Sequence, residues 1–181
     1  PSACVLSDST AFTPVGMTVR QQCRFTAATS TATIWDVTVV PSAPRGKIED
    51  VALGYVFDWD IGARGADNHI VSDDQCIPNL MRGQQSSGFV ISRESYPVAL
   101  CVAIVSPEPT DMAQVACMLV GDVIDDDDGF TPADRILLLT SGTTMATEHL
   151  GDIAASIGMR RQGAITPSTP FSFKVVIGVG A

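Results

Sequence analysis

The sequence predicts an all-β fold: an antiparallel β-sandwich of about eight short strands with one short helix. Three observations support this prediction. Runs rich in β-branched and aromatic residues recur along the chain. Turn signals built from Gly, Pro, Ser and Asn separate these runs. Strand and helix patterns do not alternate along the chain, as they do in proteins with a parallel sheet.

Length and charge narrow the possible classes of protein. The chain has 181 residues, which is near the usual size of one domain. Its net charge of -9 disfavours nucleic acid and anionic membrane surfaces as partners, since both attract clusters of Lys and Arg. The same charge is compatible with a bound divalent cation. No apolar run reaches the roughly 18 residues that a membrane span requires.

The chain begins with a segment rich in Ser, Thr and Pro, residues 1–16, which we expect to be an extended arm or linker. We expect residues 17–181 to form the sandwich domain. Apolar and polar residues alternate in 17–27, which predicts a strand with a bulge near Gln21. The run T-I-W-D-V-T-V-V, at 33–40, is β-branched and aromatic and also predicts a strand.

The most strand-like run in the chain lies within 49–61 and includes V-A-L-G-Y-V-F-D-W-D-I. A long polar segment, 62–85, follows it. Loops of this length are uncommon in compact domains and are usually functional when ordered. Strands are then predicted at 87–92 and 98–105, and the second is apolar on both faces, as in a central strand. The pattern at 113–120 fits either a strand or a helix.

The predicted helix covers 131–140. Thr131 can cap its N-terminus, and Pro132 suits its first turn. A glycine stop follows the last turn. Strands at 152–159 and 171–179 complete the predicted sandwich.

Two carboxylates mark the end of the strand at 49–61. In an extended chain Asp58 and Asp60 point to one side and Trp59 points to the other. Two carboxylates on one face repel each other unless a positive group lies between them. Oxygen-bearing residues in the following loop provide further ligands of the kind that calcium prefers. The candidate metal ligands are Asp58, Asp60, Asp67, Asn68 and Asp73, with Asp74 beside them.

A second interpretation of these carboxylates remains open at this point. They can accept hydrogen bonds from backbone N–H groups of the loop or pair with Arg64, with no metal present.

A second acidic loop lies at 121–129 and precedes the predicted helix. It contains Asp125, Asp126, Asp127 and Asp128. An EF-hand register fails here, because Gly129 at loop position 6 places Arg135 at position 12, where a bidentate acid is required. The loop is therefore either a solvated acidic turn that favours the helix N-terminus or a looser cation site.

The five cysteines have no zinc-type spacing. In an extracellular chain they would form up to two disulfides and leave one thiol, and in a reduced protein they would be small buried hydrophobic residues. The low charged fraction of 17% and the many Ser and Thr residues favour the extracellular interpretation. The candidates for disulfides are Cys4, Cys23, Cys76, Cys101 and Cys117.

Three segments taken together resemble a secreted bacterial module. V-A-L-G-Y-V-F-D-W-D-I-G, at 51–62, is similar to its "GL-F-DWDIG" strand, and L-L-L-T-S-G, at 137–142, to its "YxLLTSG" segment. The stretch from G-D-I-A-A-S-I-G-M, at 151–159, to the strand ending at Gly180 resembles its closing pattern. The insertion M-R-R-Q-G departs from that pattern. The module is found beside peptidase and immunoglobulin-like domains, so the resemblance implies an exported β-sandwich accessory domain. It carries no activity over to this chain.

The sequence has two histidines, His69 and His149, and neither belongs to a known catalytic motif. It contains no G-x-S-x-G, no H-E-x-x-H and no Cys-His signature. We therefore predict a non-catalytic extracellular or cell-surface module with a structural or adhesive role, stabilised by calcium. Its expected partners are neighbouring domains of the same exported protein, or copies of itself in a surface assembly or filament. The alternative is a carbohydrate-binding accessory module of a secreted enzyme, which would require an exposed platform built from Trp35, Tyr55, Trp59 or Tyr96.

Overall fold

The computed structural model describes residues 5–12, 16–25, 32–57, 68–72, 85–93, 98–119, 148–151 and 153–180. These residues form strands and connections, without a helix. The part of the chain so described therefore has no helix long and apolar enough to cross a membrane. The strands are β1 (Val5–Phe12), β2 (Met17–Phe25), β3 (Ala32–Pro41), β4 (Val51–Phe57), β5 (Asn68–Ser72), β6 (Gln85–Ser92), β7 (Ala99–Ser106), β8 (Asp111–Leu119), β9 (Glu148–Gly151), β10 (Ile153–Arg161) and β11 (Phe171–Gly180).

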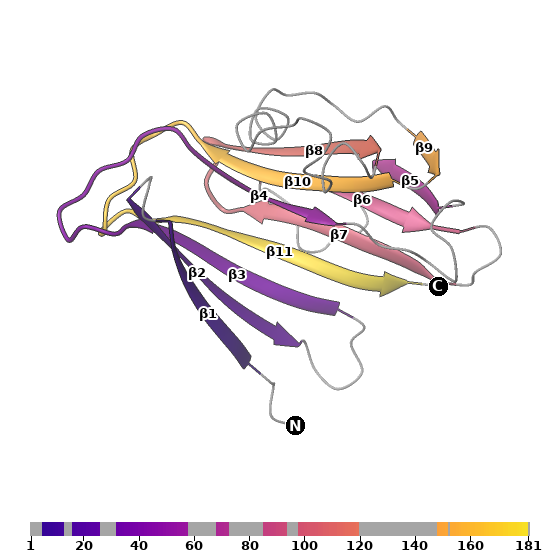
Figure 1. Cartoon of the computed structure of the whole chain (residues 1–181), viewed down its shortest axis with the longest axis horizontal. Coiled ribbons are helices and arrows are strands. Elements are labelled where there is room, and N and C mark those ends of the chain that lie inside the picture. The colour runs from indigo at the N-terminus through magenta and orange to yellow at the C-terminus, as the bar shows by residue number, and fades with distance from the viewer. Residues whose placement is uncertain are drawn as a thin grey trace.

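The strands form two antiparallel sheets (Figure 1). The large sheet has eight strands in the order β1-β2-β3-β11-β7-β6-β5-β9, and the small sheet has three in the order β4-β10-β8. Strand β11, which is last in the sequence, lies between β3 and β7 and so joins the two halves of the large sheet. The predicted all-β, antiparallel fold class is confirmed.

The core lies between the two sheets, as expected for a sandwich. Side chains alternate along each strand, so Val102 and Ile104 of β7 face the core while Ala103 between them faces away. From the small sheet, β4 and β10 bury their own apolar row against this face. The largest fully buried side chains are Phe89, Phe171, Ile91, Ile104, Ile157, Met159 and Ile165.

Several strands differ from the sequence prediction. Strand β1 lies in the segment expected to be an arm or linker, and it pairs with β2 over its whole length. Strand β5 lies inside the segment expected to be one long polar loop, because Asn68–Ser72 carries an adjacent Ile and Val and pairs with β6 and β9. The ambiguous segment at 113–120 belongs largely to β8.

The bulge expected near Gln21 is absent from β2, since the register to β1 and to β3 continues without a break through that residue. The helix predicted at 131–140 lies outside the described residues.

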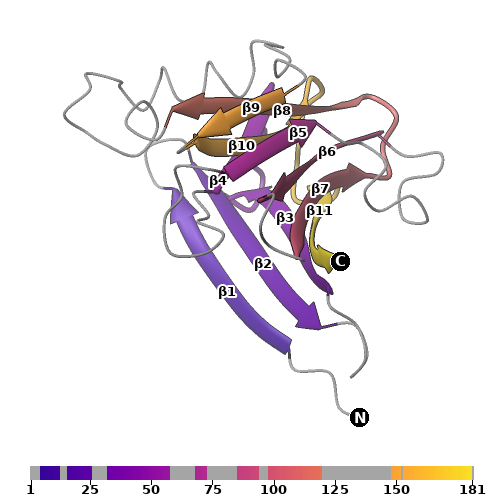
Figure 2. The same ribbon diagram turned by 90° about the vertical axis from the view of Figure 1, so that its right-hand side faces the viewer.

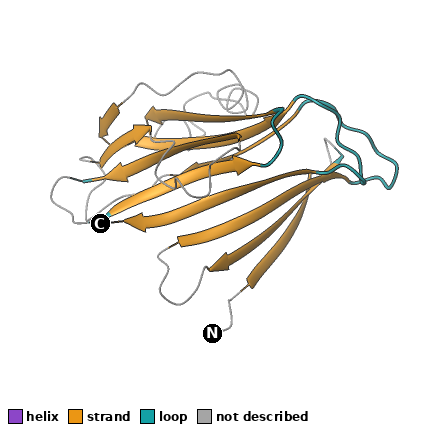
Figure 3. Cartoon of the chain, turned by 180° about the vertical axis from the view of Figure 1, so that it is seen from behind, coloured by secondary structure: helices purple, strands orange, loops and turns teal. Residues whose placement is uncertain are grey.

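The described connections at 42–50, 107–110 and 162–170 gather at one end of the sandwich (Figure 3). Two of them are joined there by paired backbone hydrogen bonds between Ile48 and Ile165, with N–O distances of 3.2 and 2.8 Å.

Strands β1 and β2 lie away from the small sheet in both side views (Figure 1 and Figure 2). Among the β2 side chains that the structure describes, Val19 belongs to the buried core cluster and Met17 packs against it. We call these two strands the β1–β2 wing.

Candidate functional site

Five strand ends meet at the end of the sandwich opposite the described connections. Phe57, the last residue of β4, pairs with Ala155 of β10, and Leu119, the last residue of β8, pairs with Ile153. In the large sheet, the first residue of β5, Asn68, pairs with Gly151, the last residue of β9. A single residue separates Gly151 from Ile153, so the two sheets end beside each other here.

The sequence-predicted metal ligands adjoin these strand ends along the chain. Asp58 and Asp60 come directly after Phe57, and Asp67 comes directly before Asn68. The three carboxylates themselves lie outside the described residues, and for Asn68 the structure describes the backbone pairing alone.

One further carboxylate belongs with this set by its position. Asp152 is the single residue between β9 and β10 and so adjoins the same end. Sequence reasoning missed Asp152. The residue before it, Gly151, pairs with Asn68 of β5, and no local sequence pattern encodes that pairing.

Asp73 adjoins a different place. It follows Ser72 at the far end of β5, and a strand of five residues separates its ends by about 13 Å. Asp73 and Asp67 therefore adjoin opposite ends of one strand. Asp73 and its neighbour Asp74, like the loop of Asp125, Asp126, Asp127 and Asp128, lie outside the described residues. Within the described part of the chain, no three His, Cys, Asp or Glu side chains are grouped so that they could hold a metal ion.

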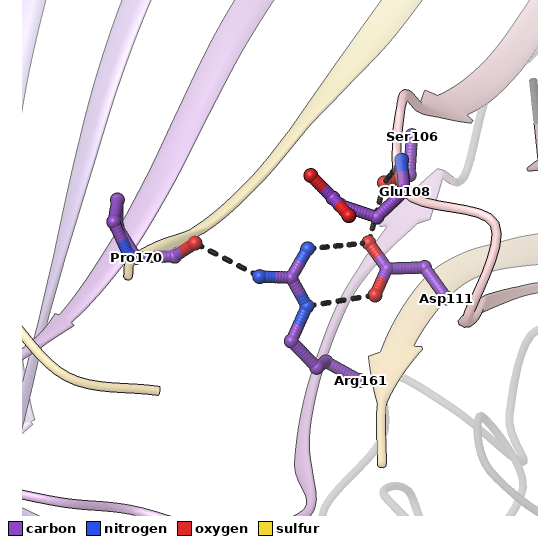
Figure 4. A network of polar contacts seen from close by, with 5 residues as sticks. All are labelled: Ser106, Glu108, Asp111, Arg161 and Pro170. Carbon is purple, nitrogen blue, oxygen red and sulfur yellow. Dashed lines mark hydrogen bonds and ion pairs between the residues drawn. The ribbon is translucent and has the colours of Figure 1, made fainter. Parts of the chain in front are cut away.

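A buried polar network lies at the other end of the sandwich (Figure 4). Arg161 of β10 donates to both carboxylate oxygens of Asp111 of β8, with N–O distances of 2.8 and 3.0 Å. The hydroxyl of Ser106, at the end of β7, donates to the same carboxylate. The third nitrogen of the guanidinium, Nη1, donates to the Pro170 carbonyl at 2.9 Å.

This network joins strands of both sheets, and the Glu108 N–H also donates to the Ser106 hydroxyl at 3.2 Å. The Asp111 side chain is 0% exposed and the Arg161 side chain 12% exposed. The guanidinium also lies over the Phe171 ring, 5.1 Å from its centre. The pair therefore links β10 to the start of β8, and loss of either partner would leave the other charge buried without a counterion.

The aromatic residues of the core form a continuous column between the sheets. Trp35 of β3 meets Tyr55 of β4 edge to face at 5.6 Å, and Phe57 lies 6.4 Å from both rings. Phe89 of β6 extends the column at 6.1 Å from Phe57. Trp35 and Tyr55 are half-buried and inclined to each other by 71°, so they do not form a flat platform of the kind that stacks on a sugar. Trp59 and Tyr96 lie outside the described residues.

The Tyr55 hydroxyl is buried, and no group in the described part of the chain forms a hydrogen bond with it. Burial raises the pKa of this phenol, so the group remains neutral over the physiological range.

On the face of the large sheet that points away from the core, Asp36 pairs with two positively charged side chains. Arg24 Nε donates to it at 2.7 Å from β2, and Lys174 Nζ donates to it at 2.5 Å from β11. Partial burial raises the pKa of Asp36, but hydrogen bonds and charge attraction from Lys174 and Arg24 outweigh it and hold the pKa below the usual value.

The two cysteines whose side chains the structure describes differ in oxidation state. Cys101 of β7 is disulfide-bonded. Cys23, one of the predicted disulfide candidates, is a free thiol, because its neighbours across β1 and β3 are Leu6 and Trp35 and not another cysteine. The side chains of Cys4, Cys76 and Cys117 lie outside the described part of the chain.

Comparison with known proteins leaves the chain without a family. No protein-family model matches it. No curated protein matches it either. Among solved structures it is similar to a chain from the human microbiome that is named as a kojibiose phosphorylase, with 8% sequence identity and a TM-score of 0.33. The match covers 92% of this chain and 18% of that one, and at this TM-score it supports no conclusion about function.

Proposed function

We propose that this chain is an extracellular, non-catalytic β-sandwich module with a structural or adhesive role, stabilised by calcium at the end of the sandwich where five strand ends meet. The observation that carries the proposal is the strand pairing at that end. The pairs Phe57–Ala155 and Asn68–Gly151 bring together, from distant parts of the sequence, the chain positions that adjoin Asp58, Asp60, Asp67 and Asp152.

Calcium takes about 6–8 oxygen ligands at about 2.3–2.6 Å, from carboxylates, amide side chains and backbone carbonyls. Strand ends provide backbone carbonyls that lack a partner in the ladder, and the sequence provides the carboxylates. The ligand set that we propose is therefore Asp58, Asp60, Asp67 and Asn68, with Asp152 added by topology.

The disulfide at Cys101 supports an extracellular location, because disulfides persist in oxidising compartments and are rare in the cytosol. The structural role is supported by the way the described ionic groups are used. Asp111 and Asp36 are each paired with Arg or Lys of neighbouring strands, so these charges link strands within the fold.

The calcium proposal is tested by thermal unfolding of the protein after chelation and after calcium is restored. A ligand present at about 100 times its Kd stabilises the folded state by about 2.7 kcal/mol. For a chain of this size that corresponds to a rise in Tm of roughly 5–10 °C. The variant D58N/D60N should lose this rise, because Asn at both positions removes two negative ligands.

The matched control is Glu49→Gln, which removes a carboxylate that pairs with Lys47 in the connection 42–50, at the other end of the sandwich. It should retain the full response to calcium. Identical melting curves with chelator and with calcium would remove calcium from the proposal.

A further inference from the structure

Strands β2, β3 and β11 carry charged side chains on the face of the large sheet that points away from the core. Val19, Val37 and Val175, one from each strand, belong to the core cluster. Side chains alternate along a strand, so the residues next to these valines face outward. The outward face of the three strands is therefore a surface separate from the core and from the small sheet.

Two rows of directly paired residues cross this outward face: Arg20, Thr38 and Ser172 in one, and Gln22, Asp36 and Lys174 in the next. The rows lie about 7 Å apart along the strands. Arg24 lies beside the second row and pairs with Asp36. In the first row, the hydroxyls of Thr38 and Ser172 lie 3.4 Å apart. We call these residues the basic face.

The basic face has a surplus of positive charge. Arg20, Arg24 and Lys174 are three cations, and Asp36 is the one Asp or Glu in the three strands. Arg24 and Lys174 already pair with Asp36, whereas Arg20 is exposed to solvent. The chain as a whole carries a net charge of -9. A positive field on this surface therefore attracts an anionic partner that the rest of the chain repels.

The exposed groups of the basic face are polar. The side chains of Arg24 and Lys174 are 42% and 44% exposed, and Arg20 is exposed beside them. The apolar residues of the adjoining row, Ile34 and Val176, are buried. Protein interfaces centre on aromatic and apolar anchors, and the basic face presents none. It therefore suits a polar anionic polymer better than a protein partner.

The chemistry of the side chains narrows the class of polymer. Nucleic acid and anionic membranes are bound through denser clusters of Lys and Arg. An acidic polysaccharide combines carboxylates with many hydroxyls. Arg forms paired hydrogen bonds with a carboxylate, and amide and hydroxyl side chains can both donate to and accept from sugar hydroxyls. The basic face places Gln22, Thr38 and Ser172 among its cations, so it offers both kinds of contact.

We propose that the basic face binds an acidic polysaccharide, with Arg20 as the main contact for the carboxylate of a uronic acid. The inference rests on the extracellular adhesive role proposed above, and it names the partner to which the module adheres. Binding of this kind uses charge and hydrogen bonds across strands, without stacking of a sugar on an aromatic platform. The basic face contains none of the proposed calcium ligands.

The test is calorimetric titration of the full chain, in low-salt buffer, with oligosaccharides of hyaluronan and of polygalacturonate. We expect binding to at least one of them, and this binding should weaken as salt is added. The methyl ester of the same oligosaccharide keeps the sugars but removes the charge, so it should not bind. Failure of both acidic oligosaccharides to bind would overturn the proposal, as would equal binding of the ester. Equal binding of polyglutamate would overturn it in favour of an acidic polypeptide.

Two variants locate the binding surface. Arg20→Gln should weaken binding about tenfold, as expected when one charge-assisted hydrogen-bonding partner is removed. Gln22→Glu should weaken it further, because it places a negative charge between Arg20 and Arg24. Both positions are exposed, so the melting temperature should stay the same and show that the variants are folded.

Arg45→Gln is the matched control, since it removes an exposed cation of the connection 42–50, outside the basic face. It should leave the affinity unchanged. Equal weakening by Arg20→Gln and Arg45→Gln would show that general charge, and not the basic face, attracts the polymer. The calcium response is measured by thermal unfolding without polysaccharide, so failure of either proposal can be told apart from failure of the other.

Discussion

At the scale of single residues, Gly46 lies where the fold leaves no room for a side chain. A Cβ placed there would lie 2.7 Å from the Pro41 Cβ and 3.1 Å from the Ala43 carbonyl oxygen. The clash is with the chain's own turn, which closes through a hydrogen bond from the Gly46 N–H to Ala43 at 2.9 Å. Side chains at this position therefore force the connection 42–50 to move.

We expect Gly46→Ala to lower the free energy of unfolding by about 1–3 kcal/mol, the usual cost of overpacking. Gly163→Ala is the matched control, since a Cβ there meets nothing within 4 Å. Chemical denaturation of both variants checks the difference. Equal stabilities would mean that the turn yields without cost.

The Tyr55 hydroxyl is a second residue-scale feature. Burying a hydroxyl without a partner costs about 1–3 kcal/mol. The Tyr55 ring contacts Trp35 and Phe57 in the aromatic column, and these contacts keep its hydroxyl in the buried position. Nothing in the sequence pattern of β4 distinguishes this tyrosine from a phenylalanine.

At the scale of elements, adjacent residues of β10 form two ion pairs of different depth. Arg160 pairs with Asp50 through two contacts of 2.8 and 2.7 Å, and the two side chains are 30% and 53% exposed. Arg161 pairs with Asp111 at similar distances, but these side chains are 12% and 0% exposed. The pair geometry is alike, but the Arg161–Asp111 pair is buried and has further contacts with Ser106, Pro170 and Phe171.

Removing one partner of a buried pair costs about 3–5 kcal/mol, because the remaining charge is left buried without a counterion. We expect Arg161→Met to have this effect on the free energy of unfolding. Arg160→Met should change stability little, because water screens the exposed Asp50. A double-mutant cycle with Asp111→Asn isolates the coupling between Arg161 and Asp111. A cost for Arg160→Met equal to that of Arg161→Met would contradict the role given to burial.

How much the sequence could predict also depends on the element. Continuous β-branched runs predicted β3, β7 and β11 well, because period and composition are local properties. Strand β5 was missed, since its five residues become a strand only by adding to the edge of β6. Strand β1 lies in a segment whose Ser, Thr and Pro content predicts an arm, and it becomes a strand by pairing with β2.

The candidate site shows the same limit. Asp58 and Asp60 could be singled out by local spacing, but Asp152 could be added only from the pairing of β5 with β9. The pair Asp111–Arg161 went unnoticed too, because 50 residues separate its members and register alone brings them together.

At the scale of the whole molecule, the β1–β2 wing lies away from the small sheet, and among its described side chains Val19 and Met17 contact the core cluster. The described contacts that attach it to the rest include the ladder between β2 and β3 and the cluster in which Asp36 receives Arg24 from β2 and Lys174 from β11. The cluster ties the wing to the central strands across the face that points away from the core. The charge state of Asp36 therefore bears on how firmly the wing is attached.

The folded-state pKa of Asp36 lies below its usual value, so the carboxylate stabilises the fold fully above a pH of about 4. This stabilisation is lost as the pH falls through the lower, folded-state pKa. We expect wild-type protein to lose protection of the β2 amides in that acidic range before the core strands open. At pH 7, Asp36→Asn should show the same selective loss, measured by hydrogen exchange and referred to the intrinsic rates.

Asp50→Asn is the control for this prediction. Its carboxylate also has a lowered pKa, caused by hydrogen bonding to Arg160, but that pair lies between β10 and the connection before β4. Both variants remove one negative charge, so a general charge effect would appear in both. Faster exchange in β2 for Asp36→Asn alone would show that the cluster holds the wing. Equal exchange in the two variants would mean that backbone pairing with β3 holds the wing without it.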